Sequence, residues 1–521
     1  MNTNRLQKHW QTLSEGEVRE LQVEKFRRYL RKVVLPFSPH YARMFAEHGL
    51  NSDSIRDLGD LQRIPFTTKA DLLPTSDLPE RFKEFIIAPR EEVLRRRFDV
   101  IWRAALSGRK QVARELSDEF RPVSIFFTTG RATEPLPFVI TNHDLQNIQS
   151  ASLRLMEICE ARPEFRMLNA FPFAPHLAFW FTYYAGVSFG ALAVCSGGGK
   201  VVGTEGNLRL LRKLKPDVLI GVPTFIYHLL HQAAQEGVSC ASLKRIVLGG
   251  EKASDGTRHK LLALARELGA RDVSVLATYG FTEAKLAWAE CPAPPGEPAS
   301  GYHLYPDLGL IEIVDPKTGL AVEPGHPGEI VFTPLDARGS VVLRYRTGDC
   351  IDGGLTYEPC PYCKRRMPRL IGHISRSSEI KELNLAKLKG TLVDFNQLEH
   401  VLDDAPHVGS WQLELRKAND DPMDLDELIL HVEKVNGAGE NQVTRELNDR
   451  FHSRTEIHPN RIVFHSAEEM RRLQGVGVQI KEQKIVDHRP RADDEPAGRS
   501  SPAAVVGRAP VIGEELVEHE S

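Results

Sequence analysis

Short apolar runs alternate with amphipathic segments through the middle of the chain. The apolar run at 218–222 precedes a predicted helix at 224–236, and the run at 246–250 precedes a predicted helix at 255–268. A third apolar run follows at 273–277. Alternation of buried strands with helices is typical of βα units, so this region is predicted to form a largely parallel sheet.

The segments on either side follow other patterns. Residues 1–60 carry apolar side chains at helical spacing among many Arg and Lys, which predicts helices. Residues 392–470 mix helix and strand patterns, as a small α+β domain would, and the segment 490–521 is predicted to be a disordered tail. After residue 300, Gly and Pro separate three runs that predict an antiparallel β region: Leu310–Val314, Glu329–Thr333 and Val341–Tyr345.

One long stretch is free of charge. No Asp, Glu, Lys or Arg occurs between Met167 and Gly199, a run long enough for a transmembrane helix. However, Pro172 and Pro175 interrupt it, and no Lys/Arg asymmetry flanks a series of spans. We therefore favour a buried helix and strand, and keep a membrane protein as the alternative.

The composition narrows the class of protein. A chain of 521 residues is predicted to form two or more domains, and a net charge of −3 offers no basic excess for nucleic acid. Seven cysteines and an N-terminus without an apolar signal core favour the cytoplasm. The chain has no P-loop motif, and the G-x-S-x-G match at Gly186–Gly190 lacks the turn residues of a nucleophile elbow.

Three short motifs, in order, carry residue types suited to nucleotide chemistry. The stretch Phe127–Pro135 (FTTGRATEP) offers hydroxyls and backbone N–H groups for an anion-binding turn. The stretch Thr278–Glu283 (TYGFTE) combines an aromatic ring with a carboxylate, which is the hard oxygen ligand that Mg²⁺ prefers. The stretch Arg344–Asp349 (RYRTGD) ends in a carboxylate whose two oxygens suit a sugar diol.

Together these motifs resemble those of the adenylate-forming superfamily of acyl-CoA synthetases. The stretch Leu61–Leu72 (LQRIPFTTKADL) resembles the phenylacetate–CoA ligase branch of that superfamily. The resemblance implies an α/β fold of the adenylate-forming type. A large N-terminal domain with βα layers and a β subdomain would span residues 1–375, and a small mobile α+β C-terminal domain would span residues 376–489.

The resemblance also implies which residues bind ATP and Mg²⁺. In the family the tyrosine stacks on adenine, the threonine meets the α-phosphate, the glutamate holds Mg²⁺ and the aspartate binds the ribose. A Gly-Gly-Glu turn would lie beside the adenine and the acyl pocket. The corresponding nucleotide-binding residues are Thr128, Thr129, Gly130, Gly250, Glu251, Tyr279, Gly280 and Asp349, and the corresponding catalytic residues are Thr282 and Glu283.

Further positions are implied at and beyond the hinge between the domains. In the string ISRSSE, Arg376 takes the place of a ribose-contacting arginine and Ser378 that of the usual hinge aspartate. Gly390 aligns with a glycine near the pantetheine path, although the chain before it is several residues longer than the family pattern. In the string IKEQKIVD, Lys481 takes the place of the lysine that stabilises the charge developing during adenylation.

A metal site is suggested by four residues of the β region. Cys360 and Cys363 form a Cys-x-x-Cys pair, and Cys291 and His303 lie upstream. Three thiolates and an imidazole would make a closed tetrahedral site for structural Zn²⁺. Some members of the resembled branch carry such an arrangement, whereas a lone Cys-x-x-Cys pair is often free of metal.

The resemblance implies ATP-dependent activation of a carboxylic acid as acyl-AMP, followed by thioester formation with coenzyme A. The aromatic segment Phe171–Trp180 lies where the family builds its acyl pocket and suits an aryl or other apolar acid. We interpret His176, within it, as a buried histidine whose hydrogen bonds are satisfied. No nucleic acid or membrane is expected as a partner, and a homodimer is one option for assembly.

Two alternatives stay open at this point. The altered hinge motivates an adenylating enzyme that passes the acyl group to an amine or a carrier-protein thiol. Thr133 and Glu134, which stand where the family usually has a glycine and often a lysine, motivate a non-catalytic relative that binds nucleotide.

Overall fold

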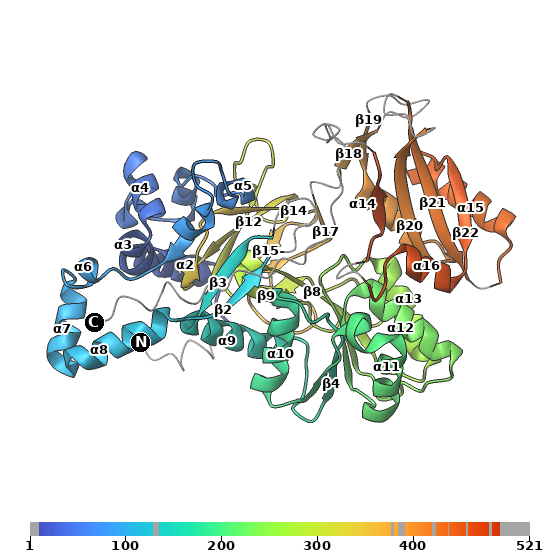
Figure 1. Ribbon diagram of the computed structural model, residues 1–521, viewed down its shortest axis with the longest axis horizontal. Helices are drawn as coiled ribbons and strands as arrows, with labels where there is room; N and C mark the ends of the chain where they lie inside the picture. The colour runs from blue at the N-terminus through green and yellow to red at the C-terminus, as the bar shows by residue number, and fades with distance from the viewer. Residues whose placement is uncertain are drawn as a thin grey trace, which may run out of the picture.

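The computed structural model describes residues 10–128, 135–376, 380–383, 391–418, 424–435, 437–454, 457–478 and 482–489. The chain forms a large body and a smaller unit from its C-terminal part, seen at the upper right of Figure 1. The predicted tail at 490–521 lies outside the described residues.

A six-stranded sheet forms the centre of one half of the large body, in the order β5-β4-β6-β7-β8-β9. Its strands are β4 (Arg166–Asn169), β5 (Leu192–Cys195), β6 (Val218–Gly221), β7 (Arg245–Leu248), β8 (Ser274–Phe281) and β9 (Leu286–Ala289). The first five strands in this order are parallel, and β9 runs antiparallel to β8. All four residues of β6 are buried, which explains its unbroken apolar run. The predicted parallel sheet is confirmed.

Five helices pack with these strands: α9 (Asn142–Ile158), α10 (Leu177–Phe189), α11 (Gly198–Leu214), α12 (Pro223–Gln235) and α13 (Asp255–Glu267). The predicted helices at 224–236 and 255–268 match α12 and α13 to within one residue. Helix α12 begins with Pro223, whose missing N–H has no helical partner at that position anyway. Helix α13 begins after Ser254, whose side chain accepts a hydrogen bond from the Thr257 N–H.

The uncharged stretch at 167–199 folds as β4, α10 and β5 in turn, which confirms the predicted helix and strand. Among the described residues, no helix is both long and apolar enough to cross a bilayer. The G-x-S-x-G match falls on the end of α10: Ser188 lies inside the helix, and Gly190, with φ of 79°, ends it in the left-handed conformation. No strand-to-helix elbow is present at Ser188.

The second half of the large body is antiparallel, as predicted. A four-stranded sheet has the order β11-β12-β14-β17, and a three-stranded sheet has the order β10-β16-β15. The strands are β10 (Tyr302–His303), β11 (Gly309–Val314), β12 (Gly328–Pro334), β14 (Tyr345–Ile351), β15 (Leu355–Thr356), β16 (Arg369–Leu370) and β17 (Ile374–Arg376).

The predicted strand at Val341–Tyr345 is wrong, because β14 begins only at Tyr345. The three preceding apolar side chains are buried in a cluster with the N-terminal helices instead. Their backbone bonds to other segments, since the Leu343 N–H donates to the Tyr41 hydroxyl at 2.8 Å. Arg344 then turns the chain with φ of 44°. An apolar run can therefore fill a core without joining a sheet.

The N-terminal part is helical, as predicted. Its helices include α2 (Glu15–Tyr29), α3 (Leu35–Phe37), α4 (Pro39–Glu47) and α5 (Lys69–Leu72). They pack their apolar side chains on the antiparallel half of the body. Helices α6 (Glu91–Leu94), α7 (Phe98–Ser107) and α8 (Arg109–Phe120) extend from the body at the left of Figure 1.

The C-terminal unit is an α+β structure with its own apolar cluster. Its four-stranded sheet has the order β22-β21-β20-β23. The elements are α14 (Phe395–Asp403), β20 (Val408–Lys417), β21 (Asp426–Lys434), α15 (Glu440–Arg454), β22 (Arg461–His465), α16 (Ala467–Leu473) and β23 (Ile485–Asp487), preceded by the hairpin β18 (Ile380–Leu383) and β19 (Thr391–Asp394). The predicted domain boundary at residue 376 stays a prediction.

Candidate active site

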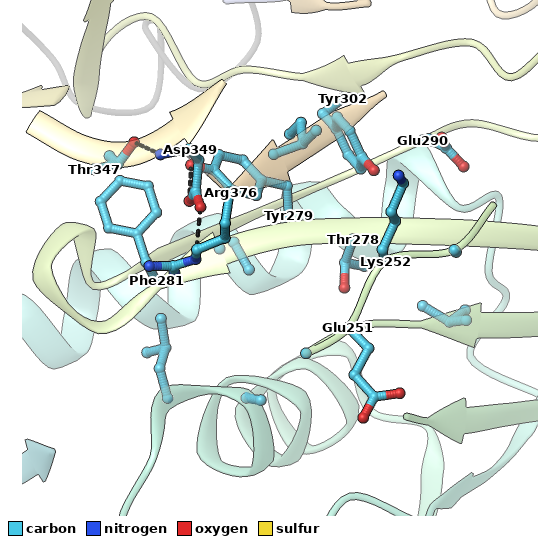
Figure 2. Close-up of a pocket in the computed structure, with 18 of the residues that line it drawn as sticks. Glu251, Lys252, Thr278, Tyr279, Phe281, Glu290, Tyr302, Thr347, Asp349 and Arg376 are labelled. Carbon is cyan, nitrogen blue, oxygen red and sulfur yellow. Dashed lines mark hydrogen bonds and ion pairs between the residues drawn. The ribbon is translucent and has the colours of Figure 1, made fainter. Parts of the chain in front are cut away.

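Three motif residues from distant parts of the sequence meet at the ends of β8, β14 and β17. The Tyr279 hydroxyl donates a hydrogen bond to Asp349 Oδ2 at 2.9 Å, and Arg376 Nε lies 2.8 Å from Asp349 Oδ1 (Figure 2). Asp349 and Arg376 are direct partners across the β14–β17 pair. The register of this antiparallel pair therefore positions a cation against the carboxylate.

The neighbouring groups of this cluster shift the pKa values of Tyr279 and Arg376. Burial raises the pKa of the Tyr279 phenol well above its usual value, and the neighbouring Asp349 carboxylate raises it further. Burial alone would lower the pKa of Arg376, but Asp349 together with Tyr279, Glu283 and Tyr345 outweighs that effect, and the pKa is raised. Tyr279 is therefore a neutral donor, and Asp349 is an acceptor held between a phenol and a guanidinium.

Glu283 lies on a short 3₁₀ turn, Thr282–Ala284, directly after β8. Its Oε1 accepts a hydrogen bond from the Tyr345 hydroxyl at 2.7 Å. Burial raises the pKa of Glu283, whereas the Tyr345 hydrogen bond and the cations Arg376 and Lys69 act in the opposite direction. A partly buried carboxylate that lines a cavity is a ligand suited to Mg²⁺.

The end of β2 (Pro122–Phe127) lies next to the turn that carries Thr282 and Glu283. The Thr282 hydroxyl donates to the Phe127 carbonyl at 3.2 Å, and His176 Nδ1 lies 2.9 Å from the same oxygen. The Thr128 hydroxyl accepts the Leu136 N–H at 3.0 Å, which ties the entry of the Thr/Gly-rich loop to its exit. His176 has this backbone partner at Nδ1, but it is only partly buried and lines the cavity described below, so our interpretation of it as a buried histidine is wrong.

The Gly-Gly-Glu turn follows β7. Gly250 has φ of 80°, a conformation that favours glycine, and a Cβ on Gly249 would collide with the Thr278 hydroxyl. The Glu251 carboxylate accepts a hydrogen bond from the Thr224 hydroxyl at 2.9 Å. Its other oxygen is buried and has no hydrogen-bond partner among the described residues. The turn thus places backbone atoms and the second carboxylate oxygen of Glu251 close to the site.

These groups line one cavity of about 1330 Å³. The sequence-predicted residues that line it are Thr128, Gly250, Glu251, Tyr279, Gly280, Thr282, Glu283, Asp349 and Arg376. Gly280 is also required by packing, because a Cβ there would approach Ala287 and the Leu286 carbonyl of β9 at 2.8 Å. The predicted residues Thr129, Gly130, Ser378, Gly390 and Lys481, with Thr133 and Glu134, lie outside the described residues.

Three cavity-lining lysines, Lys69, Lys252 and Lys484, were not singled out from the sequence. Lys69 follows the Thr67–Thr68 pair and faces Glu283, which raises its pKa against the larger lowering effect of burial. Lys484 lies just before β23 and reaches the cavity from the C-terminal unit. Lys69 and Lys484 lie inside the stretches LQRIPFTTKADL and IKEQKIVD, which resemble family motifs, and that position is the signal that could have identified them.

The C-terminal unit docks on α12 and α13 of the large body. Asp403 of α14 accepts hydrogen bonds from Ser254 and Thr257 at the start of α13, and its other oxygen accepts from Trp411 Nε1 at 2.7 Å and Lys484 Nζ at 3.3 Å. Burial alone would raise the pKa of Asp403, but Lys484 and Lys260 outweigh it and lower the pKa to about 2. Asp403 is therefore ionised at the contact.

The predicted metal ligands also come together. The ligand atoms of Cys291, His303, Cys360 and Cys363 lie within 4.8 Å of one another. Cys291 Sγ and Cys360 Sγ are 3.6 Å apart, close to the roughly 3.7 Å edge of a tetrahedron with Zn–S bonds of about 2.3 Å. His303 Nδ1 lies 3.3 Å from the Ala289 carbonyl, which leaves Nε2 facing Cys363 Sγ at 3.3 Å. The donor set fits zinc.

Comparison with known proteins assigns the class. The sequence model of the family described as "AMP-binding enzyme" matches residues 67–334, more than half of the chain. The chain belongs to this family, within the adenylate-forming superfamily, and the resemblance derived from the motifs is confirmed.

Within this class the chain is similar to phenylacetate–coenzyme A ligases. It is 28% identical to the enzyme of Thermus thermophilus over 428 residues, covering 81% of this chain and 83% of the relative. It is 25% identical to the Escherichia coli enzyme over 430 residues, covering 81% and 84%. These are the relatives whose branch the stretch Leu61–Leu72 resembles.

Solved structures confirm the fold. A 2-hydroxyisobutyryl-CoA ligase in its postadenylation state, bound to 2-HIB-AMP, aligns over 92% of both chains with a TM-score of 0.71 and 18% identity. The same ligase in its thioesterification state, bound to 2-HIB-AMP and CoA, aligns over 92% and 91% with a TM-score of 0.56 and 18% identity. The arrangement of the two units described above is thus nearer to the first of these two conformations.

Proposed function

We propose that this protein activates an apolar carboxylic acid with ATP and transfers the acyl group to coenzyme A. One observation carries the proposal: Tyr279, Glu283, Asp349 and Arg376 line a single cavity that the C-terminal unit also enters at Lys484. The similarity to phenylacetate–coenzyme A ligases supports coenzyme A as the acceptor.

In the first step, a carboxylate oxygen of the acid attacks the α-phosphorus of ATP. The bond from that phosphorus to the bridging oxygen of the β-phosphate breaks, and pyrophosphate leaves. Asp349 and Arg376 would hold the ribose, Tyr279 the adenine, and Thr282 the α-phosphate, while Thr128, Thr129 and Gly130 would meet the outer phosphates. Glu283 would hold Mg²⁺, which supplies charge neutralisation on the phosphates.

Lys481 is proposed to stabilise the charge that develops between the carboxylate and the α-phosphate. In the second step, the sulfur of coenzyme A attacks the acyl carbon and AMP leaves, with the thiol proton passing to solvent. The proposal includes a rotation of the C-terminal unit between the two steps, as in hinge-type domain motions. Gly390 would then lie near the pantetheine arm.

The direct test is ATP–pyrophosphate exchange with a panel of aryl and aliphatic acids. We expect exchange that depends on one class of acid and falls about a hundredfold in Lys481→Ala. Lys434→Ala, a surface lysine of β21 in the same unit, is the matched control and should exchange at the wild-type rate. Exchange without coenzyme A-dependent release of AMP would redirect the second step to an amine or a carrier-protein thiol, and ATP binding without any exchange would favour a non-catalytic relative.

We also propose that Cys291, His303, Cys360 and Cys363 hold a structural Zn²⁺. The ion would pin the loop after β9 to the loop between β15 and β16, which also contacts the N-terminal segment through the Arg366 N–H and the Gln11 carbonyl at 2.7 Å. Elemental analysis should find one zinc per chain, and Cys360→Ser should lose it and melt at a lower temperature. Cys195→Ser, outside the cluster, should keep the metal. Wild-type protein purified with zinc but lacking it would contradict the assignment.

A further inference from the structure

The cavity continues beyond the nucleotide-facing residues, along one face of the parallel sheet. Met167, Val218 and Arg245 pair side by side across β4, β6 and β7, and all three line the cavity. Ile220 and Val247, two residues further along their strands, pair with each other and line it too. Because alternate residues of a strand share a face, these five side chains form two successive rows on one wall.

The opposite wall comes from α9 and α10, which pack against each other while α10 also contacts β4 (Figure 1). Leu155 and Met156 of α9 and Cys159, which directly follows that helix, line the cavity, as do Phe181 and Ala185 of α10. All five belong to the buried core. Protein interiors are normally packed to crystal density, so a channel between two such walls is a built feature rather than an ordinary packing defect.

The length of this channel follows from the strands. It reaches from Gly250, after the end of β7, back to Arg245 at its beginning. At about 3.3 Å per residue, β7 alone accounts for roughly 10 Å of that path. The whole cavity exceeds the range of about 300–1,000 Å³ typical of small-molecule pockets.

Arg245 lies at the far end of the channel, and its guanidinium already has protein partners. Arg245 Nε donates to the Cys159 carbonyl at 2.9 Å, its Nη1 donates to the Lys244 carbonyl at 2.9 Å, and its Nη2 lies 3.4 Å from a Glu160 carboxylate oxygen. Each nitrogen of the guanidinium thus has a protein partner. A ligand that reaches this point meets a guanidinium that already has protein partners and the apolar side chains of the two walls, which favours an apolar distal end without a second carboxylate.

We propose that the acid activated by this protein has a long, unbranched aliphatic chain. Its carboxylate lies at the nucleotide-facing residues, and its chain runs between the sheet and helices α9 and α10 toward Arg245. The inference rests on the proposed function and specifies its substrate. A compact aryl acid would leave the two rows of the sheet wall without a partner.

The first test is a length series in ATP–pyrophosphate exchange: acetate, butyrate, hexanoate, octanoate, decanoate, dodecanoate and, for comparison, phenylacetate. Each added methylene should raise kcat/KM about fourfold until the chain meets Arg245, after which the value should fall. Octanoate or decanoate is expected to exceed phenylacetate by at least tenfold. A series that is flat beyond butyrate, with phenylacetate the best acid, would overturn the inference while leaving the proposed function intact.

The second test fills the channel. Ala185→Phe places a ring between α10 and the sheet, and should lower the ratio of decanoate to phenylacetate kcat/KM about tenfold. Val187→Phe, on the same helix with Val187 more than half exposed, adds the same ring outside the channel and should leave that ratio unchanged. An unchanged ratio in folded Ala185→Phe would overturn the inference, and if that variant does not fold, the length series alone decides.

Failure of the proposed function is distinguishable from failure of this inference. If no acid supports exchange, the activity is wrong, and decanoate binding is then measured by calorimetry without ATP. Binding to wild type and Val187→Phe that is lost in Ala185→Phe would support the channel as the site of an aliphatic chain. Absence of binding to the wild-type protein would overturn the inference.

Discussion

Replacing Glu283 with Gln should lower ATP–pyrophosphate exchange about a thousandfold. The carboxylate is partly buried and lines the cavity, accepts a hydrogen bond from Tyr345, and is proposed to hold the Mg²⁺ that neutralises the phosphates. A glutamine keeps the size and one acceptor but removes the charge, and a bound metal ion contributes several kcal/mol to such a reaction. The measurement is exchange at saturating acid across a range of Mg²⁺ concentrations, which should show a weakened dependence on the metal.

The pH profile separates this role from a merely structural one. Mg²⁺ requires the ionised carboxylate, and burial raises the pKa of Glu283, so the acidic limb of exchange should lie above the pKa of a free glutamate. Tyr345→Phe removes a hydrogen bond that lowers this pKa, and the acidic limb should therefore shift to still higher pH. Full exchange by Glu283→Gln at every Mg²⁺ concentration, or an acidic limb that Tyr345→Phe does not move, would contradict the assignment.

Removing Asp403 should uncouple the C-terminal unit from the large body. In Asp403→Ala, Ser254 and Thr257 lose their acceptor across the contact, and the partly buried Lys484 loses its ion-pair partner at 3.3 Å. Leaving a charge unpaired at a buried contact costs about 3–5 kcal/mol, so docking should weaken by about a hundredfold or more. Since the described arrangement is nearer to the postadenylation structure of the related fold, we expect adenylation to suffer most.

The measurement compares the two half-reactions. ATP–pyrophosphate exchange should fall strongly in Asp403→Ala, whereas thioester formation from supplied acyl-AMP should change much less. The neighbouring Asp404→Ala is the matched control, because Asp404 is more exposed and pairs only with Arg454 among the ion pairs of the described residues. Equal losses in both steps would indicate a general fold defect in place of lost docking.

The same carboxylate predicts a pH dependence of the contact. The pKa of Asp403 is lowered from 3.8 to about 2, so its contribution to stability is complete above pH 3.8 and is lost as the pH falls toward 2. Asp403→Ala should therefore remove part of the acid sensitivity of unfolding in that window. Thermal unfolding followed at a series of acidic pH values would check this.

The sequence by itself determined the class of protein and proposed the residues of its site. The βα alternation predicted the parallel sheet, because short strands buried on both faces must be apolar throughout, as β6 is. The order of the motifs identified Tyr279, Glu283 and Asp349, because ring stacking, metal binding and recognition of a diol each require particular functional groups. Those requirements are local and can be read one residue at a time.

Only the tertiary structure decided how these residues meet and how deep the cavity runs. The Tyr279–Asp349–Arg376 cluster depends on the register of β14 against β17, and the interruption before Tyr345 depends on burial under the N-terminal helices. The channel toward Arg245 is lined by side chains of α9, α10 and two rows of the sheet, which only the tertiary packing brings together. An apolar side chain has the same sequence pattern whether it meets another side chain or lines an open space, so packing alone makes that distinction.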